Sequence, residues 1–410
     1  MANQIELTFW NYNQFRDYKP HMLEDWIELG MTTPVTPEYD LFTTQEMEDK
    51  YFEMLNDAHN RGIQVILQIP CIYIWAFSDR DAFEERVKVA AEKFADHPAV
   101  AGLFVGEEPH GDAKEYFEGV KILRDYFPGK ILYMNMGSIE RTERCVLQGK
   151  ETITEWTKRY VEETGSNTIG YGCYAGMLDD FTGIYEHFHN IREFVEAGKK
   201  AGAEVWATML SSVHDYYRIP TEDDFRWQLN SCVACGCKGV VWFRIYDKLI
   251  AGNYLYSPID EFGEKTERYY SLARVQKRFN ATYGKIMATL HHVSTRGIGV
   301  SYGGYPYFTS YENEMNSNLI ADVSGRLGMV SEFVGDDGYD YVVLLNTDPR
   351  HGQTLGLTFT DEVERVDELL YNGDMVETVA KRIKPTDPLK FSYPFVAGQM
   401  TLYRIIKKEK

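Results

Sequence analysis

The stretch AVAGLFVGEEP, residues 99–109, is an apolar run of strand length that ends in two adjacent glutamates and a proline. The segment before it, DAFEERVKVAAEKFADHP at residues 81–98, carries apolar residues at helical spacing. Another apolar run, KILYMNMG at residues 130–137, follows after a further helical length of chain. The sequence around residue 100 therefore predicts strands that alternate with helices.

The same alternation extends outward until eight strands can be counted. The remaining seven are expected at residues 5–10, 31–35, 62–70, 130–137, 167–176, 203–212 and 238–247. A doubly wound open sheet shows the same alternation, but no glycine-rich dinucleotide fingerprint follows the first strand. The count of eight favours a closed (β/α)8 TIM barrel over residues 1–295, and its last helix is expected at residues 264–290.

The pattern changes near residue 296 to short runs of alternating polarity separated by Gly, Asp, Asn and Pro. These runs are MVSEFVG, YDYVVLLNT, LGLTFT, RVDELLY, LKFSYPF and MTLYRII. They predict a small antiparallel β-sandwich domain over residues 296–410.

Charge and composition exclude several classes of partner. The formal net charge of -19 argues against nucleic acid and anionic membranes, which require clustered Lys and Arg. The start has no leader-like pattern and no stretch approaches a membrane span, so we expect a cytoplasmic protein. Six irregularly spaced cysteines fit free thiols. Three of them lie in SCVACGC before a strand, where packing is a better interpretation than a metal site, and no cofactor or metal is expected.

Function in such a barrel lies at the carboxyl ends of the strands, where the βα loops converge. These positions are rich in aromatic and polar residues, which suit the stacking and hydroxyl binding that sugars need. The candidate binding residues are Trp10, Asn11, Trp75, Glu107, Asn135, Tyr174, His214, Trp242 and Arg244. Several of them have a structural alternative: packing for the tryptophans, a turn cap for Asn135, scaffolding for His214, and an ion pair with Asp247 for Arg244.

The glutamates at positions 107 and 108 are the strongest chemical signal. Adjacent residues of a strand point in opposite directions, so one carboxylate should face the barrel mouth and the other the surrounding shell. Glycoside hydrolysis needs a carboxylic acid with a raised pKa and, in most enzymes, a second carboxylate. The structural alternative is a surface salt bridge or an acid at a helix N-terminus.

The stretch GLFVGEEPHGD resembles the fourth strand of clan A glycoside hydrolases, in which a Glu-Pro pair carries the acid/base. This resemblance makes Glu108 the general acid. Strands four to eight also resemble barrel proteins related to family 42 β-galactosidases, and the segment from Tyr217 to Thr221 belongs to that likeness. The resemblance implies an oligosaccharide or glycoside as substrate, and it leaves homo-oligomerisation open.

The chain departs from that family at the second carboxylate. The seventh strand, AEVWATMLSS, has no glutamate at its carboxyl end, and the sixth strand lacks the aspartate of the relatives. Asp215 is the expected replacement, with Asp179 or Asp180 as alternatives. A carbohydrate-binding barrel that has lost hydrolysis is the competing hypothesis, and a lyase or hydrolase of non-sugar substrates is a third.

Overall fold

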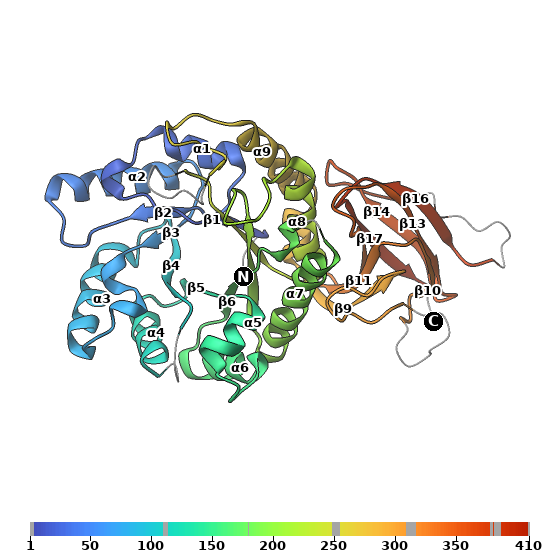
Figure 1. Cartoon of the computed structure of the whole chain (residues 1–410), viewed down its shortest axis with the longest axis horizontal. Coiled ribbons are helices and arrows are strands. Elements are labelled where there is room, and N and C mark those ends of the chain that lie inside the picture. The colour runs from blue at the N-terminus through green and yellow to red at the C-terminus, as the bar shows by residue number, and fades with distance from the viewer. Residues whose placement is uncertain are drawn as a thin grey trace.

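The computed structural model describes residues 4–109, 114–178, 180–247, 255–308, 317–377, 380 and 387–408. Its first part is a (β/α)8 barrel and its second part is an antiparallel β-sandwich, as the sequence predicts (Figure 1). The parallel sheet has the order β1-β8-β7-β6-β5-β4-β3-β2. The backbone N–H of Leu7 on β1 donates to Thr32 Oγ1 before β2 over 2.8 Å, and Thr32 N–H donates to Leu7 O over 2.9 Å. These bonds link the two ends of that order.

The described elements of the barrel follow the expected alternation. Its strands are β1 Glu6–Phe9, β2 Val35–Glu38, β3 Val65–Gln68, β4 Val100–Glu107, β5 Ile131–Met136, β6 Thr168–Gly172, β7 Glu204–Leu210 and β8 Gly239–Phe243. The helices are α1 His21–Leu29, α2 Gln45–Asn60, α3 Arg80–Phe94, α4 Lys114–Tyr126, α5 Ile139–Thr142, α6 Ile153–Thr164, α7 Phe181–Ala201, α8 Glu222–Ala234, α9 Glu267–Phe279 and α10 Lys285–Ala288.

The second strand lies three to four residues later than the sequence pattern predicts. The expected strand covers residues 31–35, whereas β2 begins at Val35. Thr32 and Thr33 instead direct their hydroxyls to Glu6 on β1. Pro34 follows them and restricts the backbone of the residue before it, so regular pairing starts only after the proline.

The second part contains two antiparallel sheets. The larger has the order β15-β14-β17-β12-β11-β9 and the smaller has the order β10-β13-β16. Their strands are β9 Leu290–Ile298, β10 Ile320–Ser324, β11 Gly328–Gly335, β12 Asp340–Asn346, β13 Gln353–Phe359, β14 Val363–Leu369, β15 Met375–Glu377, β16 Lys390–Phe395 and β17 Met400–Lys407. An apolar core fills the space between them and includes Val342, Leu355, Phe391 and Tyr403. The predicted domain division at residues 295 and 296 falls inside β9.

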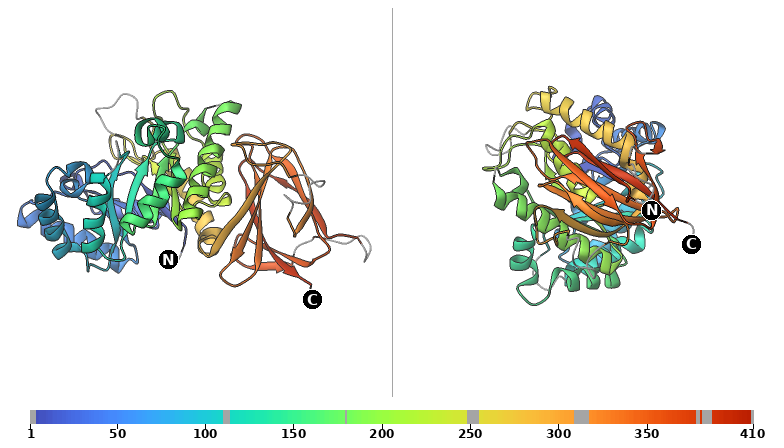
Figure 2. Two further views of the ribbon diagram at one scale, coloured as in Figure 1. Left: turned by 90° about the horizontal axis from the view of Figure 1, so that it is seen from below. Right: turned by 90° about the vertical axis from the view of Figure 1, so that its right-hand side faces the viewer.

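The larger sheet is buried on both faces. Its residues Met329, Val343 and Leu402 belong to the same apolar cluster as the helices around the barrel. Figure 2 shows this sheet lying between the barrel helices and the smaller sheet. The sandwich is therefore packed against the barrel through apolar surface.

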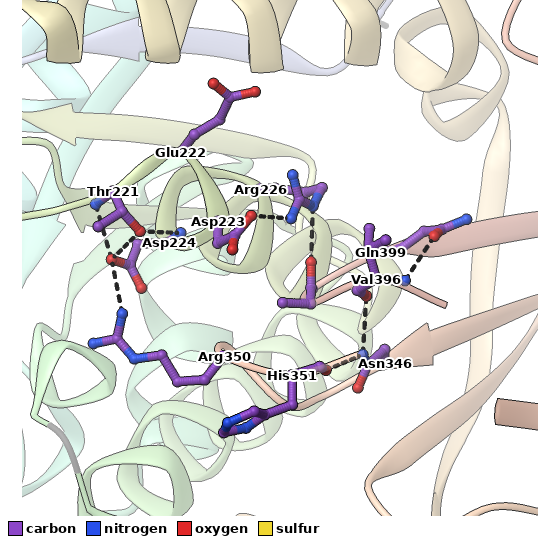
Figure 3. A network of polar contacts seen from close by, with 12 residues as sticks. Thr221, Glu222, Asp223, Asp224, Arg226, Asn346, Arg350, His351, Val396 and Gln399 are labelled. Atoms are coloured by element: carbon purple, nitrogen blue, oxygen red, sulfur yellow. Dashed lines mark hydrogen bonds and ion pairs between the residues drawn. The ribbon is translucent and has the colours of Figure 1, made fainter. Parts of the chain in front are cut away.

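Polar contacts at the start of α8 add to this packing (Figure 3). Asp224 is fully buried and accepts hydrogen bonds from Thr221 and from the guanidinium of Arg218. Arg350 of the sandwich lies 3.8 Å from the same carboxylate. Arg226 donates to the carbonyl of Ala397 over 2.8 Å. The loop between β7 and α8 is thus held where the barrel meets the second domain.

None of the helices in the described ranges combines the length and the apolar character that a membrane crossing requires.

Candidate active site

Aromatic rings crowd the inside of the barrel toward the carboxyl ends of its strands. Trp10 follows β1 and lies edge-on against Phe104 of β4, with ring centroids 4.8 Å apart. It also stacks on Tyr12 at 5.9 Å. The same interior cluster includes Tyr73, Tyr133, Met177, Trp206, Leu210 and Phe243. The predicted residue Trp10 therefore lies on the inner wall, and its indole Nε1 has no hydrogen-bond partner within the described ranges.

A β-bulge near the end of β4 decides which glutamate enters the barrel. Phe104 pairs with Tyr133 of β5, and both rings lie in the interior cluster. The register then shifts, so that Glu107 pairs with Asn135. Paired residues of neighbouring strands face the same side, and Asn135 points inward to Thr208 of β7. Glu107 therefore lies on the inner face.

Without the bulge the alternation would be reversed. A regular strand with Phe104 inside would direct Gly106 and Glu108 inward and Glu107 outward. The extra residue reverses this order, which is the effect a bulge has on the residues beyond it. Gly106 has φ +129°, a conformation that L side chains rarely adopt, so glycine is needed at this position.

The environment of Glu107 favours its neutral form. Burial first, and then the negative charge of Glu108, raise the pKa of Glu107 to about 7, while the positive charge of Arg141 opposes the rise. Burial also raises the pKa of three neighbouring tyrosines, and the charge of Glu107 contributes to each rise. These tyrosines are Tyr73, Tyr116 and Tyr133. The neutral form of Glu107 is therefore favoured to a higher pH than in an ordinary glutamate.

Glu108 lies beyond the end of β4, where the chain leaves the sheet. Its φ is +45°, and its N–H donates to the carbonyl of Asn135 over 2.7 Å. Its carboxylate forms an ion pair with Arg141 on α5. The Arg141 side chain lies against Gly137, where an added Cβ would meet Arg141 Cδ at 2.8 Å. Glu108 is thus bound to a cation, whereas Glu107 faces the apolar interior.

Asn135 presents one end of its amide to the mouth. Its Oδ1 accepts from Thr208 Oγ1 over 2.9 Å and from the Tyr133 hydroxyl over 3.3 Å. Its Nδ2 has no hydrogen-bond partner in the described part of the chain and is not among the fully covered atoms. Both contacts orient the amide, which leaves a donor for a ligand oxygen.

The loop after β7 brings together three other predicted residues. His214 packs edge-on against Tyr174, with ring centroids 5.6 Å apart. Its Nε2 lies 3.5 Å from Asp215 Oδ2. Burial lowers the pKa of His214 and the charge of Arg244 lowers it further, while Asp215 opposes them. The Asp215 side chain is 46% exposed, so the carboxylate is accessible from the solvent.

Arg244 follows β8 and is buried close to this group. Its N–H donates to Ser212 Oγ over 3.3 Å, and its carbonyl accepts from Ser211 Oγ over 3.0 Å. Its charge also acts on the pKa of Asp247, which burial raises and which the Ser257 hydrogen bonds and Arg244 lower. The arginine therefore lies between the His214 loop and Asp247.

Two of the predicted binding residues are fully buried, and their polar groups bond to the surrounding protein. Trp242 points outward from β8, is fully buried, and donates from Nε1 to Gln276 of α9 over 2.9 Å. Asn11 is also fully buried, and its Nδ2 donates to Val35 O while its Oδ1 accepts from Asn13 N–H. Trp242 occupies an outward position of β8, and both ends of the Asn11 amide form hydrogen bonds with the backbone.

Trp75 lies at the outer edge of the mouth on the short helix Ile74–Ala76, with 60% of its surface exposed. If the mouth binds a sugar, as the sequence predicts, Trp75→Ala should weaken that binding on the order of tenfold, because a stacking face is lost. The free energy of unfolding of the Trp75→Ala variant should differ from that of the wild type by less than about 0.5 kcal/mol. Trp242→Ala is the matched opposite, with a loss of about 3 to 5 kcal/mol of stability. Titration with a sugar measures binding by the two variants, and urea unfolding measures their stability. Equal effects of the two substitutions on binding would contradict the placement of Trp75 at the mouth and Trp242 away from it.

Asp179 and Asp180 are the alternatives to Asp215 as the second carboxylate. Asp180 is the N-cap of α7 and accepts from Gly183 N–H over 2.6 Å, so it serves the helix. Asp179 lies outside the described residues.

Sequence reasoning missed Arg141, Tyr133 and Thr208. Tyr133 stands two residues before Asn135 in the same strand, and this alternation could have revealed it.

Comparisons with known proteins identify the fold. No family model and no curated protein sequence matches the chain. A solved structure described as a glycoside hydrolase is 12% identical, with a TM-score of 0.60 over 99% of this chain and 93% of that chain. A family 5 glycoside hydrolase from Bacteroides vulgatus is 12% identical, with a TM-score of 0.58 over 98% and 89%. A family 39 glycoside hydrolase from Bacteroides cellulosilyticus is 11% identical, with a TM-score of 0.55 over 98% and 81%. The chain therefore has a glycosidase-like fold.

Proposed function

We propose that this chain is a glycoside hydrolase that cleaves an oligosaccharide or glycoside, and that the glutamate pair at the end of β4 supplies its general acid. The observation that carries the proposal is the inward position of Glu107, whose pKa burial and Glu108 raise to about 7. A general acid works best when its pKa lies near the working pH. The fold shared with solved glycoside hydrolases supports the same reaction class.

Within this proposal the roles of the two glutamates change from those that the family resemblance implies. Glu107 is the proton donor, because it holds a proton near neutral pH and shares the inner face with Asn135. Glu108 is the charged neighbour that raises the pKa of Glu107. Asp215 remains the proposed second carboxylate, since it is exposed in the loop after β7. Trp10, Trp75, Asn135, Tyr174, His214 and Arg244 are the proposed sugar-binding residues.

The proposed site needs no cofactor, because positioning and proton transfer account for hydrolysis. The six cysteines are free thiols. Free thiols fit a reducing compartment, and we propose a cytoplasmic location on that basis.

A carbohydrate-binding barrel without turnover is the second candidate. One observation favours it: β7 ends in Leu210, and the two residues after it are Ser211 and Ser212, so no carboxylate stands at this fully described strand end. Most glycoside hydrolases need two carboxylates. The choice between the two functions depends on whether Asp215 or another group replaces the missing one.

Hydrolysis by the purified chain separates the two candidates. A panel of aryl glycosides of both anomeric configurations and natural disaccharides should include one substrate that is turned over, with product release followed by absorbance and chromatography. Asp215→Asn should lower that turnover at least about a hundredfold if Asp215 is the second carboxylate. Sugar binding by calorimetry with no turnover on any substrate would replace the hydrolase with the binding barrel.

A further inference from the structure

A cleft opens at the seam between the two domains, on the outside of the barrel. Its walls are one face of α8 and α9 and two turns of the sandwich, one between β14 and β15 and one between β16 and β17. The volume of the cleft is about 180 Å³, whereas an ordered water needs only about 10 to 15 Å³. None of the described residues that line it belongs to the proposed active site, so hydrolysis in the barrel does not account for the cleft.

Three guanidinium groups line the cleft, and two of them are already fixed by other groups. Arg226 of α8 forms an ion pair with Asp223 and donates from Nε to the carbonyl of Ala397 over 2.8 Å (Figure 3). Arg274 of α9 donates from Nε and Nη2 to Glu222 over 3.0 and 2.6 Å. Each of these two cations therefore has a carboxylate of its own.

Arg278 carries the third guanidinium, one turn further along α9, and it differs from the other two. Its Cζ lies 3.9 Å from the centre of the Tyr371 ring. No described residue forms a hydrogen bond or an ion pair with its side chain, so its N–H donors have no acceptor in the described part of the chain. In a chain with a net charge of -19, a cation that lines a cleft without a carboxylate partner is available to an anion.

The remaining walls offer a hydrogen-bond acceptor and apolar surface. Asn230 of α8 is 6% exposed, and its Nδ2 donates to the carbonyl of Gly398 over 2.9 Å. Its Oδ1 has no hydrogen-bond partner among the described residues and is not one of the fully covered atoms, so it can accept from a ligand hydroxyl. Tyr371 and Val396, one from each turn, are both about half exposed. They supply ring and aliphatic surface beside the free guanidinium.

We propose that this cleft is a second binding site and that its ligand is an acidic sugar, a hydroxylated ring that carries a carboxylate or a phosphate. Arg278 binds the acid group, because a planar guanidinium can donate two parallel hydrogen bonds to a carboxylate or a phosphate. Asn230 Oδ1 accepts from a ring hydroxyl, and Tyr371 and Val396 contact the apolar face of the ring. The inference goes beyond the proposed function and does not depend on hydrolysis in the barrel.

Calorimetric titration of the full chain tests the site. Glucuronate and a glucose phosphate are the probes for the two acid groups, and glucose is the neutral control. At least one acidic sugar should bind more tightly than glucose, and its affinity should fall at least about tenfold in Arg278→Met, because charge-assisted hydrogen bonds are lost. Arg278→Lys should recover only part of the affinity, since an ammonium keeps the charge and lacks the planar pair of donors. The two acids, compared with each other, identify the acid group that the cleft prefers.

Two further variants locate the binding. Lys277→Met is the matched control, because it removes the same charge from the adjacent position of α9, and Lys277 does not line the cleft. Trp75→Ala changes the barrel mouth instead, so it should leave the affinity for the acidic sugar unchanged.

Three results would overturn the inference. One is equal affinity for glucose and both acids, and another is an equal loss of affinity in Arg278→Met and Lys277→Met. Inorganic phosphate that binds as tightly as the glucose phosphate is the third, because the ring would then contribute nothing. A loss in Trp75→Ala with none in Arg278→Met would place the ligand at the barrel mouth, which overturns the site in the cleft and leaves the proposed function in place.

Discussion

Replacing Glu107 by glutamine should reduce turnover about a hundredfold to ten-thousandfold, because the variant keeps the shape of the side chain and loses its proton. The effect should fall on kcat more than on KM, since proton transfer occurs only in the transition state. Steady-state kinetics on the best substrate of the glycoside panel measures it. The wild-type rate should decline as the pH rises through about 7, where Glu107 loses its proton.

Glu108→Gln is the matched control for this result. It removes the negative charge that raises the pKa of Glu107, so the alkaline limb of its pH profile should move to lower pH. Turnover at the new optimum should survive better than in Glu107→Gln. The reverse order, with Glu108→Gln the more damaging variant and Glu107→Gln only weakened, would restore Glu108 as the proton donor.

Glu107→Gln should also make the protein more stable than the wild type in alkaline solution. The pKa of Glu107 in the folded chain is about 7, above its usual value of 4.5. Below pH 4.5 both states hold the proton and nothing is lost, whereas between 4.5 and 7 the unfolded chain alone releases it. Stability therefore falls as the pH rises through this window, by up to about 3 kcal/mol. Glu107→Gln should lack this fall in urea unfolding at a series of pH values; an identical fall in both proteins would contradict the raised pKa.

The second large effect is expected at the buried carboxylate of α8. Asp224→Ala should lower the free energy of unfolding by about 3 to 5 kcal/mol, because it removes the buried carboxylate that binds the guanidinium of Arg218 and also removes a helix capping contact. Arg350 of the sandwich loses the same carboxylate. Urea unfolding measures the loss.

Asp223→Ala is the matched control, because Asp223 is the neighbouring residue but is 49% exposed and pairs with Arg226. Its cost should stay below about 1 kcal/mol. Sugar binding should also weaken in Asp224→Ala, since Arg218 belongs to the loop that carries His214 and Asp215. Equal losses of stability in the two alanine variants would show that burial of Asp224 contributes nothing special.

The sequence predicts the architecture well and the orientation of side chains less well. Alternation of strands and helices gave the barrel, and period-two runs gave the sandwich, because both patterns are local. The strand β9 was missed because the helical pattern of residues 264–290 runs directly into it. Whether a strand begins at Leu290 depends on its pairing with Gly335 of β11, which is distant in the chain.

The sequence predicts candidate site residues at the carboxyl ends of the barrel strands, but it does not determine which of their side chains face the interior. The bulge in β4 is a mismatch with β5, so no local pattern of GLFVGEEP contains it. Trp242 is a candidate from sequence because it lies near the carboxyl end of the eighth strand, but the run GVVWF has no alternation that separates inside from outside. Arg141 stands outside every strand and can be found only through its contact with Glu108.

The bonds that join the two domains have a bearing on how the chain can change over generations. Trp227, Asn230 and Tyr283 of the barrel donate to the main-chain carbonyls of Thr347, Gly398 and Met400 in the sandwich. Every residue type has such a carbonyl, so mutations at most of these acceptor positions leave the bonds intact. Gly398 is the exception, because a Cβ there would lie 2.6 Å from the Trp227 backbone. Among related chains the three donor residues of the barrel should therefore vary slowly. The acceptor positions of the sandwich should vary more, except at Gly398.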